Sequence, residues 1–171
     1  KYNSLHNLDG PWHAPRRKPR LIEVAADQDV AVIQLVRSNL LKRHVSSRLA
    51  AMNDTYRTTD PDALEVTTLT LTPEVLVPTL REQQRQMELV RGWLGPRALE
   101  VAYEDLWTAD TGVDRAVLDL LCAHVGIEPV ASLEVEVATQ THDDLRHVIE
   151  NYDEIAEHLA TTEFAHLVAP G

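Results

Sequence analysis

Arg37 ends an apolar run, and a helical pattern dense in basic and hydroxyl residues follows it in residues 32–50, VIQLVRSNLLKRHVSSRLA. Lys42 and Ser46 are four residues apart and Arg43 and Ser46 three apart, so basic and hydroxyl groups can share one helix face. Arginine offers a planar fork to phosphate, and serine adds a compact hydroxyl donor. The spacing predicts a site for a terminal phosphate, against the alternative that these side chains only face water.

A strand and a helix would position this site. Residues 29–36 are β-branched and almost continuously apolar, which predicts a strand covered on both faces, as in a parallel sheet. From Asn39 to Met52, apolar residues recur at helical spacing, which predicts an amphipathic helix. In open parallel sheets, ligands bind beyond the carboxyl ends of the strands, which is where Arg37 falls.

The rest of the chain repeats this alternation. The first 20 residues are rich in proline and polar residues, which predicts an irregular segment. Caps, breakers and periodicity predict the further elements: a helix from about Pro73 to Leu94, a strand at 99–103, a helix ending near Gly126, a short extended piece at 133–138 and a helix within 142–160. Strands separated by helices predict a single three-layer α/β domain over residues 1–171.

Composition and charge limit the class of protein. The 44% hydrophobic and 25% charged fractions are typical of a soluble globular chain, and no apolar stretch is long enough to cross a bilayer. The first residues lack the layout of a signal peptide, so a cytoplasmic location is expected. A formal charge of −11 argues against binding to nucleic acid or to an anionic membrane, although it leaves room for a local small-anion site.

The other residues that could do chemistry carry weaker signals. Cys122 lies in apolar surroundings, which predicts a buried structural thiol. The histidines show no metal-ligand spacing backed by cysteines and no HExxH pattern, so no metal site is predicted.

Three segments together resemble the sulfotransferases that use 3′-phosphoadenosine-5′-phosphosulfate (PAPS), in particular the bacterial members. Residues 32–50 resemble their 3′-phosphate-binding strand and helix, VAYEDLW at 101–107 resembles their Tyr-Glu-Asp-Leu strand end, and HVIENYDEIAEHL at 147–159 is similar to their C-terminal helix. The segments follow the family's order and span most of 30–160. The resemblance implies a P-loop-NTPase-like fold, in which helices flank a parallel sheet.

The resemblance also implies roles for individual residues. Arg37 and Ser46 would grip the 3′-phosphate of PAPS, with Ser47 as a neighbouring substitute for Ser46. Tyr103 would lie near the adenine, whereas a tyrosine at a strand end otherwise packs in the core. Bacterial members often have a second basic residue where this chain has Ser38, so Arg37 would make that contact alone.

The implied reaction transfers a sulfuryl group from PAPS to an acceptor hydroxyl or amine and releases adenosine 3′,5′-bisphosphate (PAP), without a metal. The chain lacks the Gly/Ser-rich loop that holds the 5′ end of PAPS in the family, so we expect its N-terminal part to be incomplete. Lys1 matches a family lysine, but Asn3 stands where some members have a histidine base. His6 and His13 are weak candidates for that base, and a glutamate before Lys1 is an equal alternative.

Two other functions remain open. A nucleotide-dependent small-molecule kinase would need a GxxxxGKS/T loop, which the chain does not contain. A non-catalytic α/β interaction domain would bind a partner through its long helices. For the leading hypothesis, carbohydrate, glycolipid, phenol and small-alcohol acceptors all fit the sequence. The helix from Pro73 is a candidate surface for a homodimer or for one wall of the acceptor site.

Overall fold

The computed structural model of the chain describes residues 18–54, 66–107, 112–131, 133 and 144–168. The predicted irregular segment at 1–20 and the extended piece at 133–138 lie almost wholly outside these residues. The chain forms two compact units: the first comprises Lys1–Val36 and Gln84–Glu134, and the second comprises Arg37–Gln83 and Val135–Gly171. One domain over the whole chain stays a prediction. None of the helices in the described ranges has the length and apolar character that a bilayer span needs.

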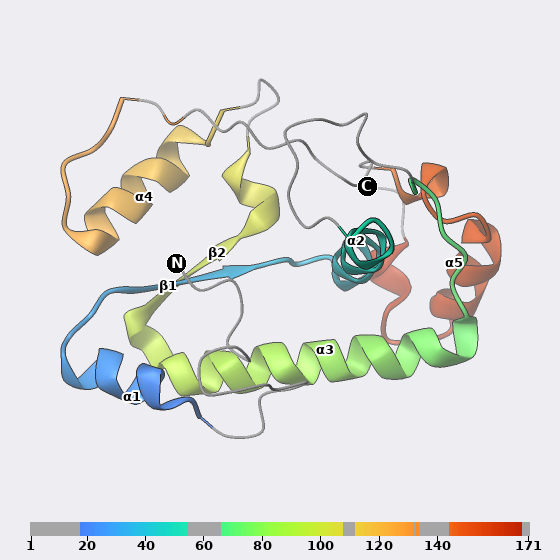
Figure 1. Cartoon of the computed structure of the whole chain (residues 1–171), viewed down its shortest axis with the longest axis horizontal. Coiled ribbons are helices and arrows are strands. Elements are labelled where there is room, and N and C mark those ends of the chain that lie inside the picture. Colours follow the sequence, from blue (N-terminus) through green and yellow to red (C-terminus); the bar gives the residue numbers. More distant parts are fainter. Residues whose placement is uncertain (1–17, 55–65, 108–111, 132, 134–143, 169–171) are drawn as a thin grey trace. The chain divides into compact units, whose positions relative to one another are not determined.

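A parallel pair of strands forms the sheet of the first unit (Figure 1). β1 (Val32–Val36) and β2 (Ala98–Ala102) pair in register, from Val32 opposite Ala98 to Val36 opposite Ala102. Both predicted strands are confirmed, and so is their parallel direction. Parallel strands need a crossover between them, and helices lie in this one. The chain therefore belongs to the α/β class.

One face of β1 is more exposed than the sequence predicts. Ile33 and Leu35 point to the same side of the strand and are 41% and 55% exposed, while the alternating residues are half-buried. The prediction that residues 29–36 are covered on both faces is therefore wrong. An apolar run shows that a strand can be buried, but the run does not determine how many other strands or helices cover that strand. In the described sheet, β1 pairs with β2 alone.

The first helix of the first unit, α1 (Arg20–Asp27), is not predicted from the sequence. It begins after Pro19 without a side-chain cap and buries Ile22, so its local signals are weak. Two short 3-10 turns flank β2: η3 (Gly95–Arg97) before it and η4 (Tyr103–Leu106) after it. These turns fix where β2 begins and ends.

Helix α4 (Arg115–Val125) has a marked start and a marked end. The Asp114 carboxylate accepts hydrogen bonds from the backbone N–H groups of Ala116 at 2.9 Å and Val117 at 3.1 Å. Gly126 ends the helix with a φ of 73°, which suits glycine, so the predicted end is confirmed. His124 ties α4 to the sheet, because its Nε2 lies 2.9 Å from the carbonyl oxygen of Val32.

The second unit is helical around an apolar core. It contains α2 (Leu40–Met52), the first half of α3 (Pro73–Leu94), α5 (Tyr152–Ala160) and the short turns η5 (Leu145–His147) and η6 (Ala165–Leu167). The predicted helices at 39–52 and 73–94 are confirmed. The largest fully buried side chains all belong to this unit: Phe164, Leu41, Leu49, Leu80, Ile149, Ile155, Leu159 and Val45.

The last predicted helix is shorter in the structure than the periodicity within 142–160 indicates. α5 begins at Tyr152, because the residues before it pair with another part of the chain. The N–H of Leu69 donates to the carbonyl of Val148 at 2.9 Å, and the N–H of Glu150 donates to the carbonyl of Leu69 at 3.0 Å. Backbone groups that form this bridge cannot also make helical hydrogen bonds, so the helix starts later.

Two asparagine side chains act as substitutes for a strand partner. The Asn151 amide accepts from the N–H of Leu71 at 3.0 Å and donates to its carbonyl at 2.8 Å. The Asn53 amide does the same for Val66, with both bonds at 2.8 Å. Each side chain therefore satisfies the backbone N–H and C=O groups of a residue that belongs to no helix or strand.

Candidate oxyanion-binding site

Asn39 fixes the point at which α2 begins. Its side-chain oxygen accepts a hydrogen bond from the N–H of Lys42 at 2.9 Å, and its carbonyl oxygen accepts one from the N–H of Arg43 at 3.0 Å. Its side-chain nitrogen lies 3.5 Å from the carbonyl oxygen of Leu167. The first turn of α2 is therefore oriented by local bonds and by a contact with a distant part of the second unit.

The apolar face of α2 determines where its polar face points. The side chains that anchor the helix in the core are at most 1% exposed: Leu41, Val45 and Leu49. Lys42, Arg43 and Ser46 are half-buried, and the two basic residues precede Ser46 by four and three positions. α2 therefore carries the basic and hydroxyl residues on one face that is partly shielded from water. Ser47, the neighbour of Ser46, is exposed.

Arg37 follows β1 directly, belongs to no helix or strand, and falls with α2 in the second unit. It is half-buried and already interacts with another group of the protein. An anion that binds Arg37 would have to share its guanidinium with that group or displace it.

Tyr103 belongs to the first unit, whereas Arg37, Ser46 and Ser47 belong to the second. It opens η4 at the carboxyl end of β2 and packs edge-to-face against Trp107, with ring centroids 5.8 Å apart and planes at 66°. The indole N–H of Trp107 is buried and, in the described structure, has no hydrogen-bond partner. The packing gives Tyr103 a structural role, and the unsatisfied indole beside it is a feature that the sequence did not indicate.

Three predicted residues, Lys1, His6 and His13, lie outside the described residues, so their roles stay predictions. Cys122 is 3% exposed, which confirms the predicted buried thiol. Within the described ranges, no group of three or more His, Cys, Asp or Glu residues is arranged to hold a metal ion.

The charged residues of α2 itself are all basic. Residues 30–53 contain no Asp or Glu. Burial lowers the pKa of Arg43, and burial together with the positive charge of Arg48 lowers the pKa of His44. A lowered pKa on a base means that its charged form is held at a cost, which an approaching anion would reduce.

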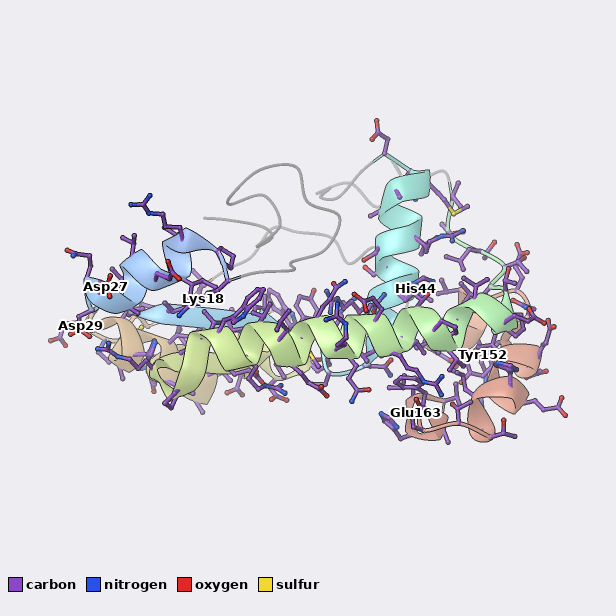
Figure 2. All side chains as sticks on the ribbon, turned by 90° about the horizontal axis from the view of Figure 1, so that it is seen from below. Lys18, Asp27, Asp29, His44, Tyr152 and Glu163 are labelled. Atoms are coloured by element: carbon purple, nitrogen blue, oxygen red, sulfur yellow. The ribbon has the colours of Figure 1, made fainter. Side chains whose placement is uncertain are left out.

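His44 lies where α2 meets α3, and Figure 2 labels it there. Its Nδ1 is 3.4 Å from the side-chain nitrogen of Gln83. Because this imidazole is half-buried beside Arg48, protonating it would place a second positive charge in a poorly hydrated position.

Acidification is therefore expected to destabilise the second unit through His44. The pKa of His44 is lowered in the folded chain. Below the ordinary histidine pKa of about 6.5, the unfolded chain therefore binds a proton more readily than the folded chain does. The free energy of unfolding then decreases as the pH is lowered. Urea unfolding can be measured at about pH 7.5 and about pH 5, on either side of that value. Between these two conditions, the free energy of unfolding should decrease less for His44→Gln than for the wild type.

The matched control is His166→Gln, which changes an exposed histidine of the same unit. This variant should respond to pH like the wild type. If His44→Gln also did so, His44 would carry no pH-dependent part of the stability.

Comparisons of the chain with protein-family models, with curated proteins and with solved structures find no match.

Proposed function

We propose that the chain belongs to a PAPS-dependent sulfotransferase and that α2 provides the binding site for the 3′-phosphate of the nucleotide. The polar face of α2 is the observation that supports this function best. It carries two cations and a hydroxyl, all half-buried, in a stretch without acidic residues that directly follows a strand of a parallel sheet. Guanidinium and hydroxyl donors at neighbouring helix positions suit a phosphate monoester.

In this proposal the residues keep the roles that the resemblance implies. Arg37 and Ser46 hold the 3′-phosphate, and Ser47 lies next to them. Tyr103 lies near the adenine, where the unsatisfied indole N–H of Trp107 would offer a hydrogen-bond donor to a purine ring nitrogen. The two parallel strands would belong to a three-layer, P-loop-like sheet.

The proposed reaction breaks the bond between sulfur and the 5′-phosphate oxygen of PAPS and forms a bond between sulfur and the acceptor oxygen or nitrogen. The acceptor loses its proton to a base, for which His6 and His13 are the candidates in the chain, and PAP leaves. Such a transfer depends on alignment and on donors that stabilise charge on the leaving and equatorial oxygens. The acceptor would be a carbohydrate, a glycolipid or a small alcohol, and the enzyme would be cytoplasmic.

A non-catalytic interaction domain is the second candidate, because the first unit exposes many apolar side chains. Those at least 40% exposed are Val24, Val30, Ile33, Leu35, Leu120, Val125, Ile127, Val130 and Leu133. Partner binding without any affinity for adenine nucleotides would favour this function over the sulfotransferase.

Arg37→Ala is expected to weaken PAP binding by about 10–100-fold, since a hydrogen bond to a charged group contributes about 1.5–3 kcal/mol. Isothermal titration calorimetry of the 171-residue chain with PAP measures this change. Adenosine 5′-monophosphate, which lacks the 3′-phosphate, should bind both proteins with similar affinity.

Arg48→Ala is the matched control, because Arg48 is an exposed arginine of the same helix. It should leave the affinity for PAP within a few-fold of the wild type. Unchanged PAP affinity in Arg37→Ala would remove Arg37 from the site, and a wild-type chain that binds no PAP would contradict the proposed function itself.

A further inference from the structure

Arg43 differs from most arginines in the described part of the chain. Four arginines form ion pairs: Arg81 with Glu163, Arg91 with Glu100, Arg97 with Asp29 and Arg115 with Asp119. The Arg146 guanidinium lies over the Tyr152 ring, 5.5 Å from its centre, and Arg20, Arg37 and Arg85 also have interaction partners. Among the described residues, Arg43 and Arg48 are the arginines whose guanidinium groups form no hydrogen bond, ion pair or ring contact with the protein.

These two arginines differ in burial. Arg48 is exposed, so water can hydrate its charge. Arg43 is half-buried, so its guanidinium loses part of its hydration without gaining a protein partner. A partly buried charge without a partner is costly, and such groups are enriched at sites where a ligand supplies the missing interaction.

Ser46 is the neighbour that completes the arrangement. It follows Arg43 by three positions, which places the two residues roughly 60° apart around the helix axis. Ser46 is also half-buried, and its hydroxyl forms no hydrogen bond with the described residues. Two adjacent and half-buried donors on one helix face are therefore both unsatisfied, in a stretch with no acidic residue that could be their intended partner.

We propose that Arg43 and Ser46 together bind an oxyanion of the phosphate type, the guanidinium as a planar donor and the hydroxyl as a second donor. In combination with the proposed function, on which this further step rests, the oxyanion is the 3′-phosphate of the nucleotide. Arg43 then supplies a second cation to that phosphate beside Arg37. The sequence shows that Arg43 and Ser46 are three residues apart. Only the structure shows that the Arg43 guanidinium has no partner among the described residues.

Arg43→Gln is expected to weaken PAP binding by about 10–100-fold, the effect of losing one charge-assisted contact. Arg48→Gln removes the same charge from an exposed position of the same helix, roughly 200° around the axis from Ser46. It should leave PAP affinity within about threefold of the wild type. Calorimetry with PAP, with adenosine 5′-monophosphate and with inorganic phosphate separates nucleotide binding from binding of the bare anion.

The outcomes distinguish this inference from the proposed function. Equal losses in Arg43→Gln and Arg48→Gln, or no loss in Arg43→Gln, would overturn the inference, while the Arg37→Ala result would still decide the function. A chain that binds inorganic phosphate through Arg43 but binds no PAP would overturn the proposed function and keep the oxyanion site. A chain that binds neither ligand would overturn both.

Stability provides a readout that a structural arginine would not give. Arg43→Met keeps an apolar stem and removes the unpaired charge, so without ligand its unfolding temperature should equal or exceed that of the wild type. Addition of PAP should raise the unfolding temperature of the wild type more than that of Arg43→Met. A lower unfolding temperature of the variant without ligand would show that Arg43 has a structural role and would overturn the inference.

Discussion

Replacing Phe164 with alanine is expected to lower the free energy of unfolding by about 3–5 kcal/mol. Phe164 is 1% exposed and is among the largest fully buried side chains of the second unit. Removing its ring leaves a cavity that the surrounding side chains can fill only in part. Urea unfolding followed by circular dichroism measures the change, which is a large part of the roughly 5–15 kcal/mol that stabilises a typical domain.

Two variants frame this experiment. Phe164→Leu keeps most of the apolar volume and should cost less than Phe164→Ala. Val75→Ala truncates a side chain that is 60% exposed on α3 and should change stability by no more than about 0.5 kcal/mol. If Phe164→Ala behaved like Val75→Ala, Phe164 would not belong to the core that the structure shows.

Asn151→Ala is expected to cost about 2–4 kcal/mol, because it leaves two backbone groups of Leu71 unpaired at once. Leu71 is 4% exposed, so water cannot easily replace the lost bonds. The change also removes the bond from Asn151 to Glu154, which lies in the first turn of α5. Chemical denaturation gives the difference in free energy.

Asn151→Asp tests the same contact more finely. It keeps an acceptor for the N–H of Leu71, but it has no donor for the Leu71 carbonyl and brings a second negative charge to Glu154, so the loss should remain clearly above zero. A loss below about 0.5 kcal/mol in Asn151→Ala would mean that other groups satisfy Leu71 and that Asn151 does not act as a strand partner.

Elements with strong local signals were predicted well. The helix Pro73–Leu94 has a proline suited to its first turn and a glycine just after its last residue, and its predicted bounds agree with the structure. The apolar spacing from Asn39 to Met52 likewise predicted α2, which the structure shows to be capped by Asn39. These features depend on a few residues next to one another, so the sequence contains them directly.

Features that depend on distant segments were predicted poorly. The helical spacing in 142–160 is real, but the bridge to Leu69 takes up the backbone before Tyr152, and periodicity does not report such a competitor. The exposure of Ile33 and Leu35 likewise depends on what flanks β1, which an apolar run does not specify.

The candidate site shows the same division. The spacing of Lys42, Arg43 and Ser46 predicted a shared helix face, and α2 is helical through all three positions. Which arginine lacks a partner could not be predicted, because some of the partners come from far along the chain. Arg81 and Glu163, for example, are 82 residues apart.

The two bonds between Asn53 and Val66 attach the residue that caps the end of α2 to a residue 13 positions further along the chain. The end of α2 is therefore held by a contact outside the helix as well as by the helix's own hydrogen bonds. Asn53 is accordingly a position to keep unchanged when α2 is engineered.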